Sequence, residues 1–279
     1  MKMKRNEKLG MLTGLVVGVL LLLISVFMIF QTTCKVWGAE KPANATQQGI
    51  DVSSHQGKID WEQVKNSALA DYAIIRCGYG VNQTDKDDKY WDYNSSECER
   101  LGIPYGTYLY SGADTTAKAR SEAEHVVRLL QGKNLTYPIY YDMEADMLNQ
   151  LSSTQIGNIA KTFLNTMESY GYKNVAVYSN KYLFETKLTA SVFSDYPKWI
   201  AQHSNKCTYR GSYHMWQYST QGVIPGISEK VDLNYKIGNW TYAGYSSAKK
   251  TVVVKPKATT IKSLKKSGKK AIKITYKKV

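Results

Sequence analysis

Eight short apolar runs of strand length, spread between residues 49 and 233, constrain the fold of this chain more than any other feature. Segments with helical spacing separate the first five runs, whereas the last three follow one another almost without a helix. Such alternation favours a parallel sheet that is covered by helices. The predicted strands are Gly49–Val52, Ala73–Cys77, Tyr105–Tyr110, Pro138–Asp142, Val175–Tyr178, Lys198–Gln202, His214–Tyr218 and Val231–Leu233.

Two of the intervening segments carry a clear helical pattern. Apolar residues recur every three or four positions in Thr154–Tyr170, which Gly171 terminates, and a similar stripe runs through Thr116–Leu130. Together with the eight strands they predict an α/β fold, an irregular TIM-like barrel over residues 49–245 whose second half lacks its helices. The missing helices explain why this domain is shorter than the usual barrel of about 250 residues.

Residues 9–30 form an unbroken run of uncharged, mostly apolar residues. As a helix this run would be about 33 Å long, enough to cross the ~30 Å hydrocarbon core of a bilayer. Basic residues within positions 1–8 predict a cytoplasmic N-terminus and an extracytoplasmic remainder. We therefore predict a single-pass transmembrane anchor in the cell membrane, followed by a stalk at 31–48. The alternative is a cleaved signal peptide and a secreted protein, but no small-residue cleavage site directly follows the run.

The formal net charge of +14 resides in the two ends of the chain. Residues 249–279 hold 12 lysines and no acid, whereas residues 49–248 hold 19 basic and 21 acidic residues. An enzyme that acts on nucleic acid carries its positive charge on the domain that grips the phosphates. The sequence therefore predicts no nucleic-acid partner.

Residues 246–279 differ from the rest of the chain. After a basic linker, two segments that end at Leu264 and Tyr276 alternate apolar and basic residues around a Lys-Ser-Gly-Lys turn. They predict the first two strands of a truncated β-sandwich-like module, because two strands alone cannot bury a core. The alternative is a basic tail that is attracted to anionic polymers or phospholipid surfaces.

Cysteine and glycine motifs indicate neither a metal site nor a cofactor. The four cysteines form no C-x-x-C pair and have no histidines at zinc-ligand spacing. A disulfide between Cys77 and Cys98 and buried free thiols are both compatible with the sequence. The chain also lacks a phosphate-binding loop, a G-x-S-x-G turn and an H-E-x-x-H helix.

Two acids, Asp142 and Glu144, end the fourth predicted strand. Residues two apart on a strand face the same side, with Cβ atoms about 7 Å apart. The carboxyl ends of barrel strands form the face at which barrel enzymes hold their active sites. Two adjacent carboxyl groups suit glycoside hydrolysis, in which one of them must be protonated, and burial with mutual repulsion raises a pKa for that purpose.

Two further acids belong to the first and last predicted strands. Asp51 ends the first strand, and Asp232 is placed at the end of the last. Because these strands are neighbours in a closed barrel, we expect both side chains on the rim that also carries Asp142 and Glu144. A cluster of carboxyl groups that share protons explains this convergence better than a contribution to stability does.

Five motifs, in this order, resemble the lysozymes of glycoside hydrolase family 25 over about residues 48–242. They are Asp51-Val-Ser-x-His-Gln-Gly, Tyr141-Asp-Met-Glu144, Trp199-Ile-Ala-Gln202, Met215-Trp-Gln-Tyr218 and Val231-Asp-x-Asn234. The resemblance implies a (β/α)5β3 barrel and a muramidase. Its substrate would be the peptidoglycan glycan strand, cut at the β-1,4 bond between N-acetylmuramic acid and N-acetylglucosamine.

The resemblance also implies a role for each acid. Glu144 would be the general acid and base, and Asp142 its partner. Asp142 would either orient the substrate's 2-acetamido group as an internal nucleophile or act as the nucleophile itself. Asp51 would complete the catalytic set, and Asp232 would bind substrate. The short spacing of Asp142 and Glu144 suits retention of configuration.

Aromatic and amide side chains near strand ends are the other predicted substrate ligands. Tyr79, Tyr108 and Trp216 could stack on sugar rings, although core packing is the alternative for each. Gln202 and Gln217 are predicted to donate hydrogen bonds to the substrate. The sequence leaves two alternatives to a muramidase: a non-catalytic wall-binding ectodomain on the same fold, and a chitinase-like hydrolase.

Overall fold

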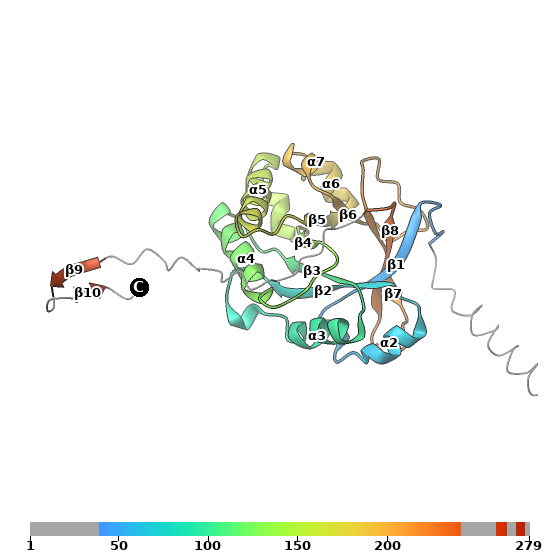
Figure 1. The fold of residues 1–279 in the computed structure, drawn as a ribbon. Coiled ribbons are helices and arrows are strands. Elements are labelled where there is room, and N and C mark those ends of the chain that lie inside the picture. Colours follow the sequence, from blue (N-terminus) through green and yellow to red (C-terminus); the bar gives the residue numbers. More distant parts are fainter. Residues whose placement is uncertain (1–38, 241–260, 267–271, 277–279) are drawn as a thin grey trace, which may run out of the picture. The chain divides into compact units, whose positions relative to one another are not determined.

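The computed structural model describes residues 39–240, 261–266 and 272–276. Residues 39–240 contain a closed barrel of eight strands that neighbour one another in chain order (Figure 1). The strands are β1 (Ala45–Val52), β2 (Tyr72–Tyr79), β3 (Tyr105–Tyr110), β4 (Ile139–Asp142), β5 (Val175–Asn180), β6 (Lys198–Ala201), β7 (Met215–Gly222) and β8 (Val231–Ile237). The expected α/β barrel is therefore confirmed, with every predicted strand in place.

Helices cover the barrel from outside (Figure 1). They are α2 (Trp61–Ser67), α3 (Trp91–Leu101), α4 (Thr116–Leu129), α5 (Ser153–Ser169), α6 (Lys181–Thr186) and α7 (Val192–Asp195). The two helices predicted from their apolar stripes are α4 and α5. Ser152 caps α5 in a capping box with Gln155, which satisfies backbone groups that a helix start leaves unpaired. Between β6 and β8 the described chain has no helix, as the sequence predicts.

Alternate residues of each strand fill the barrel interior. Large side chains dominate this core, including Tyr140 of β4, Tyr178 of β5 and Trp199 of β6. Gly49 makes room for another core ring, that of Tyr72, because a Cβ atom at position 49 would lie 2.4 Å from it. The intervening residues face the helices, and Tyr141 stacks on Phe163 of α5 with ring centroids 3.8 Å apart. This alternation decides which residues reach the barrel mouth.

The direction of β8 corrects one sequence-based placement. β8 pairs antiparallel with both β7 and β1, whereas the other neighbouring strands are parallel. Asp232 was expected at the end of the last strand, but it is the second residue of β8. Because β8 runs the other way, its beginning lies beside the end of β1, and Asp232 is in register with Asp51. The two acids therefore do share a rim.

Several other expectations concern the ends of the chain and the cysteines. Strands β9 (Ile261–Lys266) and β10 (Ile272–Tyr276) form an antiparallel pair in a separate compact unit. The predicted anchor at 9–30 lies outside the described residues, and the described part of the chain contains no helix that could cross a membrane. Cys77 and Cys98 are buried free thiols, and Cys207 is also free.

Candidate active site

A cavity of about 70 Å³ lies at the carboxyl ends of the parallel barrel strands. Its small volume accommodates part of a sugar rather than a whole disaccharide, so a longer substrate must rest on the surrounding rim. Four of its eight lining residues are acids. The lining residues are Asp51, Tyr108, Asp142, Glu144, Tyr178, Trp199, Gln217 and Asp232. The structure thus brings together the four acids that the sequence places on strands one, four and eight.

The end of β4 sets the positions of Asp142 and Glu144. Tyr140 and Asp142 share the inner face of the strand, and β5 holds the chain beyond it. The backbone N–H of Met143 donates to the carbonyl of Tyr178, at 2.9 Å, and the hydroxyl of Ser179 donates to the carbonyl of Met143. These bonds keep residue 143 aligned with β5, so that Glu144 follows Asp142 into the cavity.

Asp51 is oriented by two amide side chains. Its Oδ2 atom accepts hydrogen bonds from Asn234 Nδ2, at 2.7 Å, and from Gln217 Nε2, at 2.9 Å. The amide oxygens face donors in turn: Trp199 Nε1 donates to Asn234 at 2.8 Å, and the Tyr178 hydroxyl donates to Gln217 at 2.9 Å. The two amides can satisfy both of their hydrogen bonds in one orientation only. This series of hydrogen bonds therefore holds the carboxyl group of Asp51 rigidly.

Asp142 is held quite differently. Its side chain is buried, and its Oδ1 atom has no hydrogen-bond donor among the described residues. The guanidinium of Arg76 opposes the rise in the pKa of Asp142, but that group is bonded to Asp88, at 2.8 Å, and to Ser54, at 2.9 Å. A buried acceptor without a donor is costly in a protein and is therefore a site at which a ligand can supply the missing hydrogen bond.

Burial raises the pKa of all four carboxyl groups. For Asp51 and Asp142 the pKa lies well above its usual range, and neighbouring carboxyl groups, Asp232 and Glu144 respectively, add to the effect of burial. Burial and the charge of Asp51 raise the pKa of Glu144. Burial also raises the pKa of Asp232 to about 6. The mouth can therefore hold protons near neutral pH, as a general acid must.

Three of the predicted substrate ligands do not line this cavity. Trp216 faces outward, because its neighbours Met215 and Gln217 face inward, and it packs against Tyr218 and Tyr235. Tyr79 is 43% exposed, with its hydroxyl 3.5 Å from the carbonyl oxygen of Asp85.

Gln202 is engaged by its own loop. Its side chain forms hydrogen bonds with both the backbone N–H and the hydroxyl of Thr208, at 2.8 and 3.0 Å. Its backbone carbonyl accepts a hydrogen bond from Trp216 Nε1 at 2.8 Å. By contrast Tyr108 and Gln217 line the cavity, as predicted.

Sequence reasoning did not place Trp199 and Asn234 among the site residues. A signal was available, because both residues stand in the quoted motifs. Because neighbouring residues of a strand face opposite sides, Trp216 and Gln217 cannot both reach the cavity, so strand alternation alone makes them alternatives. Among the described residues, no group of His, Cys, Asp or Glu side chains is arranged to hold a metal ion.

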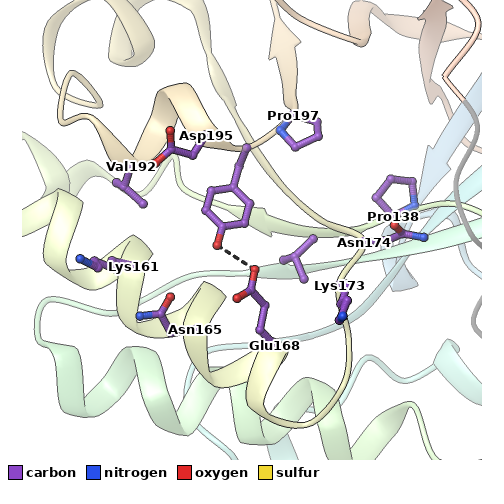
Figure 2. A pocket seen from close by; sticks show the side chains of 11 residues that line it. Pro138, Lys161, Asn165, Glu168, Lys173, Asn174, Val192, Asp195 and Pro197 are labelled. Carbon is purple, nitrogen blue, oxygen red and sulfur yellow. Dashed lines mark hydrogen bonds between the residues drawn. The ribbon is translucent and has the colours of Figure 1, made fainter.

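A larger hollow of about 400 Å³ lies at the opposite end of the barrel (Figure 2). Pro138, Val175 and Pro197 line it, and they stand at or directly before the beginnings of β4, β5 and β6. Figure 2 shows Glu168 of α5 among the lining side chains, where it accepts a hydrogen bond from Tyr196 at 3.0 Å. Its polar lining residues are mostly exposed, and barrel enzymes do not build active sites at this end.

Comparison with known proteins gives a consistent set of relatives. The model of glycosyl hydrolases family 25 matches residues 50–227. The autolytic lysozyme of Clostridium acetobutylicum is 30% identical over 188 residues, which cover 67% of this chain and 55% of that protein. The uncharacterized protein YegX of Escherichia coli K12 is 27% identical over 199 residues, covering 69% of this chain and 70% of that protein.

A solved structure adds to this set. The modular autolysin LytC of Streptococcus pneumoniae, in complex with a synthetic peptidoglycan ligand, is 33% identical with a TM-score of 0.62. The match covers 68% of this chain and 46% of LytC, so the chain spans less than half of that larger protein.

Proposed function

Because the chain belongs to glycosyl hydrolase family 25, we propose that it is a muramidase that hydrolyses the β-1,4 bond from N-acetylmuramic acid to N-acetylglucosamine in peptidoglycan. The observation that carries this proposal is the convergence of four carboxyl groups with raised pKa values on one cavity of the barrel mouth. The names of the autolytic lysozyme and of the LytC complex support the choice of peptidoglycan as the substrate.

Glu144 is the general acid in this proposal. Like Asp232, it is only partly buried, and its raised pKa favours the protonated form that a general acid needs. It gives this proton to the glycosidic oxygen as the bond to the leaving sugar breaks. As a carboxylate, it then removes a proton from the water that attacks the anomeric carbon.

Asp142 acts on the 2-acetamido group of the sugar whose anomeric carbon is attacked. Its donor-free Oδ1 atom can accept a hydrogen bond from the N–H of the 2-acetamido group, which aims the acetamido oxygen at the anomeric carbon. That oxygen forms a bond as the glycosidic bond breaks, and water later opens the ring that results. Two displacements at one carbon retain its configuration. Direct attack by Asp142 is the alternative route to the same stereochemistry.

Analysis of new reducing ends tests the proposed activity. Residues 39–240 hold the complete barrel, so the full chain and this segment are both incubated with purified peptidoglycan, beside Glu144→Gln. We expect fragments that end in N-acetylmuramic acid, released by both wild-type forms and lost in the variant. If the new reducing ends are N-acetylglucosamine instead, the enzyme is a glucosaminidase and not a muramidase. Wall binding without any release would favour a non-catalytic ectodomain, and release from chitin instead would favour a chitinase-like hydrolase.

We propose that residues 9–30 anchor the enzyme in the cell membrane, with the barrel on the extracytoplasmic side. The uncharged run and the basic residues that precede it support this location. The mass of the protein recovered from cells separates anchor from signal peptide. An anchored chain keeps its N-terminal residues and stays in the membrane fraction after a high-salt wash, whereas a shortened, soluble chain would contradict the anchor.

A further inference from the structure

A second hollow opens on the same rim as the carboxyl-lined cavity. It has a volume of about 510 Å³, and we call it the rim hollow. The loop that follows β6, the end of β7 and the residue that precedes β8 form its walls. The lining residues are His203, Ser204, Asn205, Tyr218, Ser219, Thr220, Gln221 and Lys230.

The rim hollow and the carboxyl-lined cavity share a wall. His203 Nε2 lies 3.0 Å from the Oε1 atom of Gln217, and Gln217 in turn donates to Asp51. On the other side, Gln56 follows the end of β1 and donates to the carbonyl of Lys230 at 3.0 Å. Asp232, which lines the cavity, is only two residues further along the chain. The two spaces therefore adjoin on one rim, within reach of a branch of a substrate in the mouth.

The chemistry of the two spaces is opposite. The cavity is lined by four acids, whereas the rim hollow is lined by hydroxyl, amide and imidazole groups with one lysine and no acid. Lys230 is exposed, and no ion pair holds its ammonium group among the described residues. Such a lining suits a ligand that carries a carboxylate and many hydrogen-bonding groups.

The lining does not suit a further sugar ring. Sugar sites present an aromatic face to the pyranose, and the ring in this wall is that of Tyr218. Tyr218 is only 3% exposed, and its ring stacks on Tyr235 with centroids 4.4 Å apart. The other lining residues offer polar atoms and short side chains, which match a peptide backbone and its carboxyl groups.

We propose that the rim hollow binds the peptide branch of the muramic acid residue that is being cut, with Lys230 paired to a carboxylate of that peptide. The inference rests on the proposed function, since it assumes that peptidoglycan is the substrate. It adds a substrate preference: glycan strands that carry their peptides are better substrates than the same strands after the peptides have been removed.

Turnover of two forms of one substrate tests this inference. Peptidoglycan strands are prepared with their peptides and, in a second portion, stripped of them, and kcat/KM is measured on both with the full chain. We expect the intact strands to be preferred roughly five- to tenfold, the net effect of about one hydrogen bond at an exposed site. Lys230→Ala should lower that ratio towards one.

Lys206→Ala is the matched control. Lys206 lies on the same rim loop and pairs with Glu40 at 3.2 Å, but it does not line the rim hollow. This variant should keep the wild-type ratio. A free tetrapeptide with two carboxylates should also inhibit the wild type more strongly than it inhibits Lys230→Ala.

The outcomes separate the two proposals. If the wild type cuts neither substrate, the proposed function falls. If it cuts both with equal kcat/KM, or if Lys230→Ala and Lys206→Ala lower the ratio equally, the rim hollow does not bind the peptide and the muramidase stands. A thermal melt of each variant, expected to match the wild type, shows that the fold is intact.

Discussion

Buried carboxyl groups occur in two regions of this barrel, and the protein treats them in opposite ways. Behind β3 and β4, outside the barrel wall, Glu122 of α4 is fully buried and accepts three hydrogen bonds. The donors are the backbone N–H of Gly112 at 2.8 Å and the hydroxyls of Tyr141 at 2.6 Å and Ser111 at 2.9 Å. In the mouth, Asp142 is equally inaccessible, and its Oδ1 atom has no donor among the described residues.

The difference teaches what a raised pKa does and does not indicate. Burial raises the pKa of Glu122 as well as those of the mouth acids, so the direction of the shift does not separate the two regions. The supply of donors does. Glu122 uses its charge to hold the ends of two strands, because Ser111 also donates its N–H to the carbonyl of Asp142 at 2.9 Å. In the mouth, Asp142 keeps acceptor capacity that a substrate can use.

The largest effect is expected for Glu144→Gln. Glutamine keeps the size of the side chain but cannot donate a proton, so kcat/KM on peptidoglycan should fall by about 10²–10⁴-fold. The thermal midpoint should stay at or above that of the wild type, because a group with a raised pKa is lost. If the variant loses activity only because it unfolds, Glu144 serves the fold, as Glu122 does, and not catalysis.

Glu122→Gln should mainly reduce stability. Glutamine can keep its Oε1 atom on the N–H of Gly112, but its NH2 group then faces the two hydroxyls, which must turn to accept from it. The charge-assisted hydrogen bonds from both hydroxyls are lost. We expect the free energy of unfolding in urea to drop by about 2–4 kcal/mol. Glu124→Gln, on the same helix, is the control and should change it by less than about 0.5 kcal/mol. Equal effects would show that the donors around Glu122 contribute little.

The pH dependence of stability should carry the signature of the mouth. The folded-state pKa of Asp232 is about 6, above the unfolded value near 4, so the folded protein binds the proton more tightly. Stability from this group is fully present below about pH 4 and is lost as the pH rises through about 6, by roughly 3 kcal/mol. Unfolding curves between pH 4 and 8 should show this decline, and Asp232→Asn should flatten it. An unchanged slope would mean that Asp232 titrates as an exposed acid.

The smallest effect is expected for two tryptophans, one of which supports the site while the other lies outside it. Trp199 donates to Asn234, which orients Asp51, whereas Trp216 donates to the carbonyl of Gln202 outside the cavity. Trp199→Phe should lower kcat/KM about tenfold, since Asn234 loses the partner that fixes its amide. Trp216→Phe should leave KM within about twofold. A rise in KM for Trp216→Phe alone would restore it as a substrate ligand.

The sequence predicts the barrel well because period and length leave few alternatives. Strand β3 has the bounds that were expected, and α5 begins and ends one residue earlier than expected. The direction of β8 was not predictable from its own residues. Val231 to Ile237 alternate in the same way whichever way the strand runs, and only the pairing with β1 and β7 decides.

The sequence predicts the site residues whose charge is unusual in a strand. It misses those whose role depends on the direction of the side chain or on a contact between distant strands. Asp51, Asp142, Glu144 and Asp232 interrupt apolar strands, and charged groups do so rarely without a function. Tyr79 and Trp216 have the right chemistry but do not line the cavity. Asn234 orients Asp51 across 183 positions of sequence, a relation that no local pattern contains.

The most direct test of the account is the stability of Asp142→Asn, measured at pH 7 together with its activity. Replacing this buried carboxyl group, whose Oδ1 atom has no donor among the described residues, should raise the free energy of unfolding by about 1–3 kcal/mol, while kcat on peptidoglycan falls at least about 100-fold. A variant that is more stable and inactive would show that the carboxyl group of Asp142 destabilises the fold and is needed for hydrolysis. A variant that is less stable, or that keeps its activity, would contradict the account, because Asp142 would then support the fold in the way that Glu122 does.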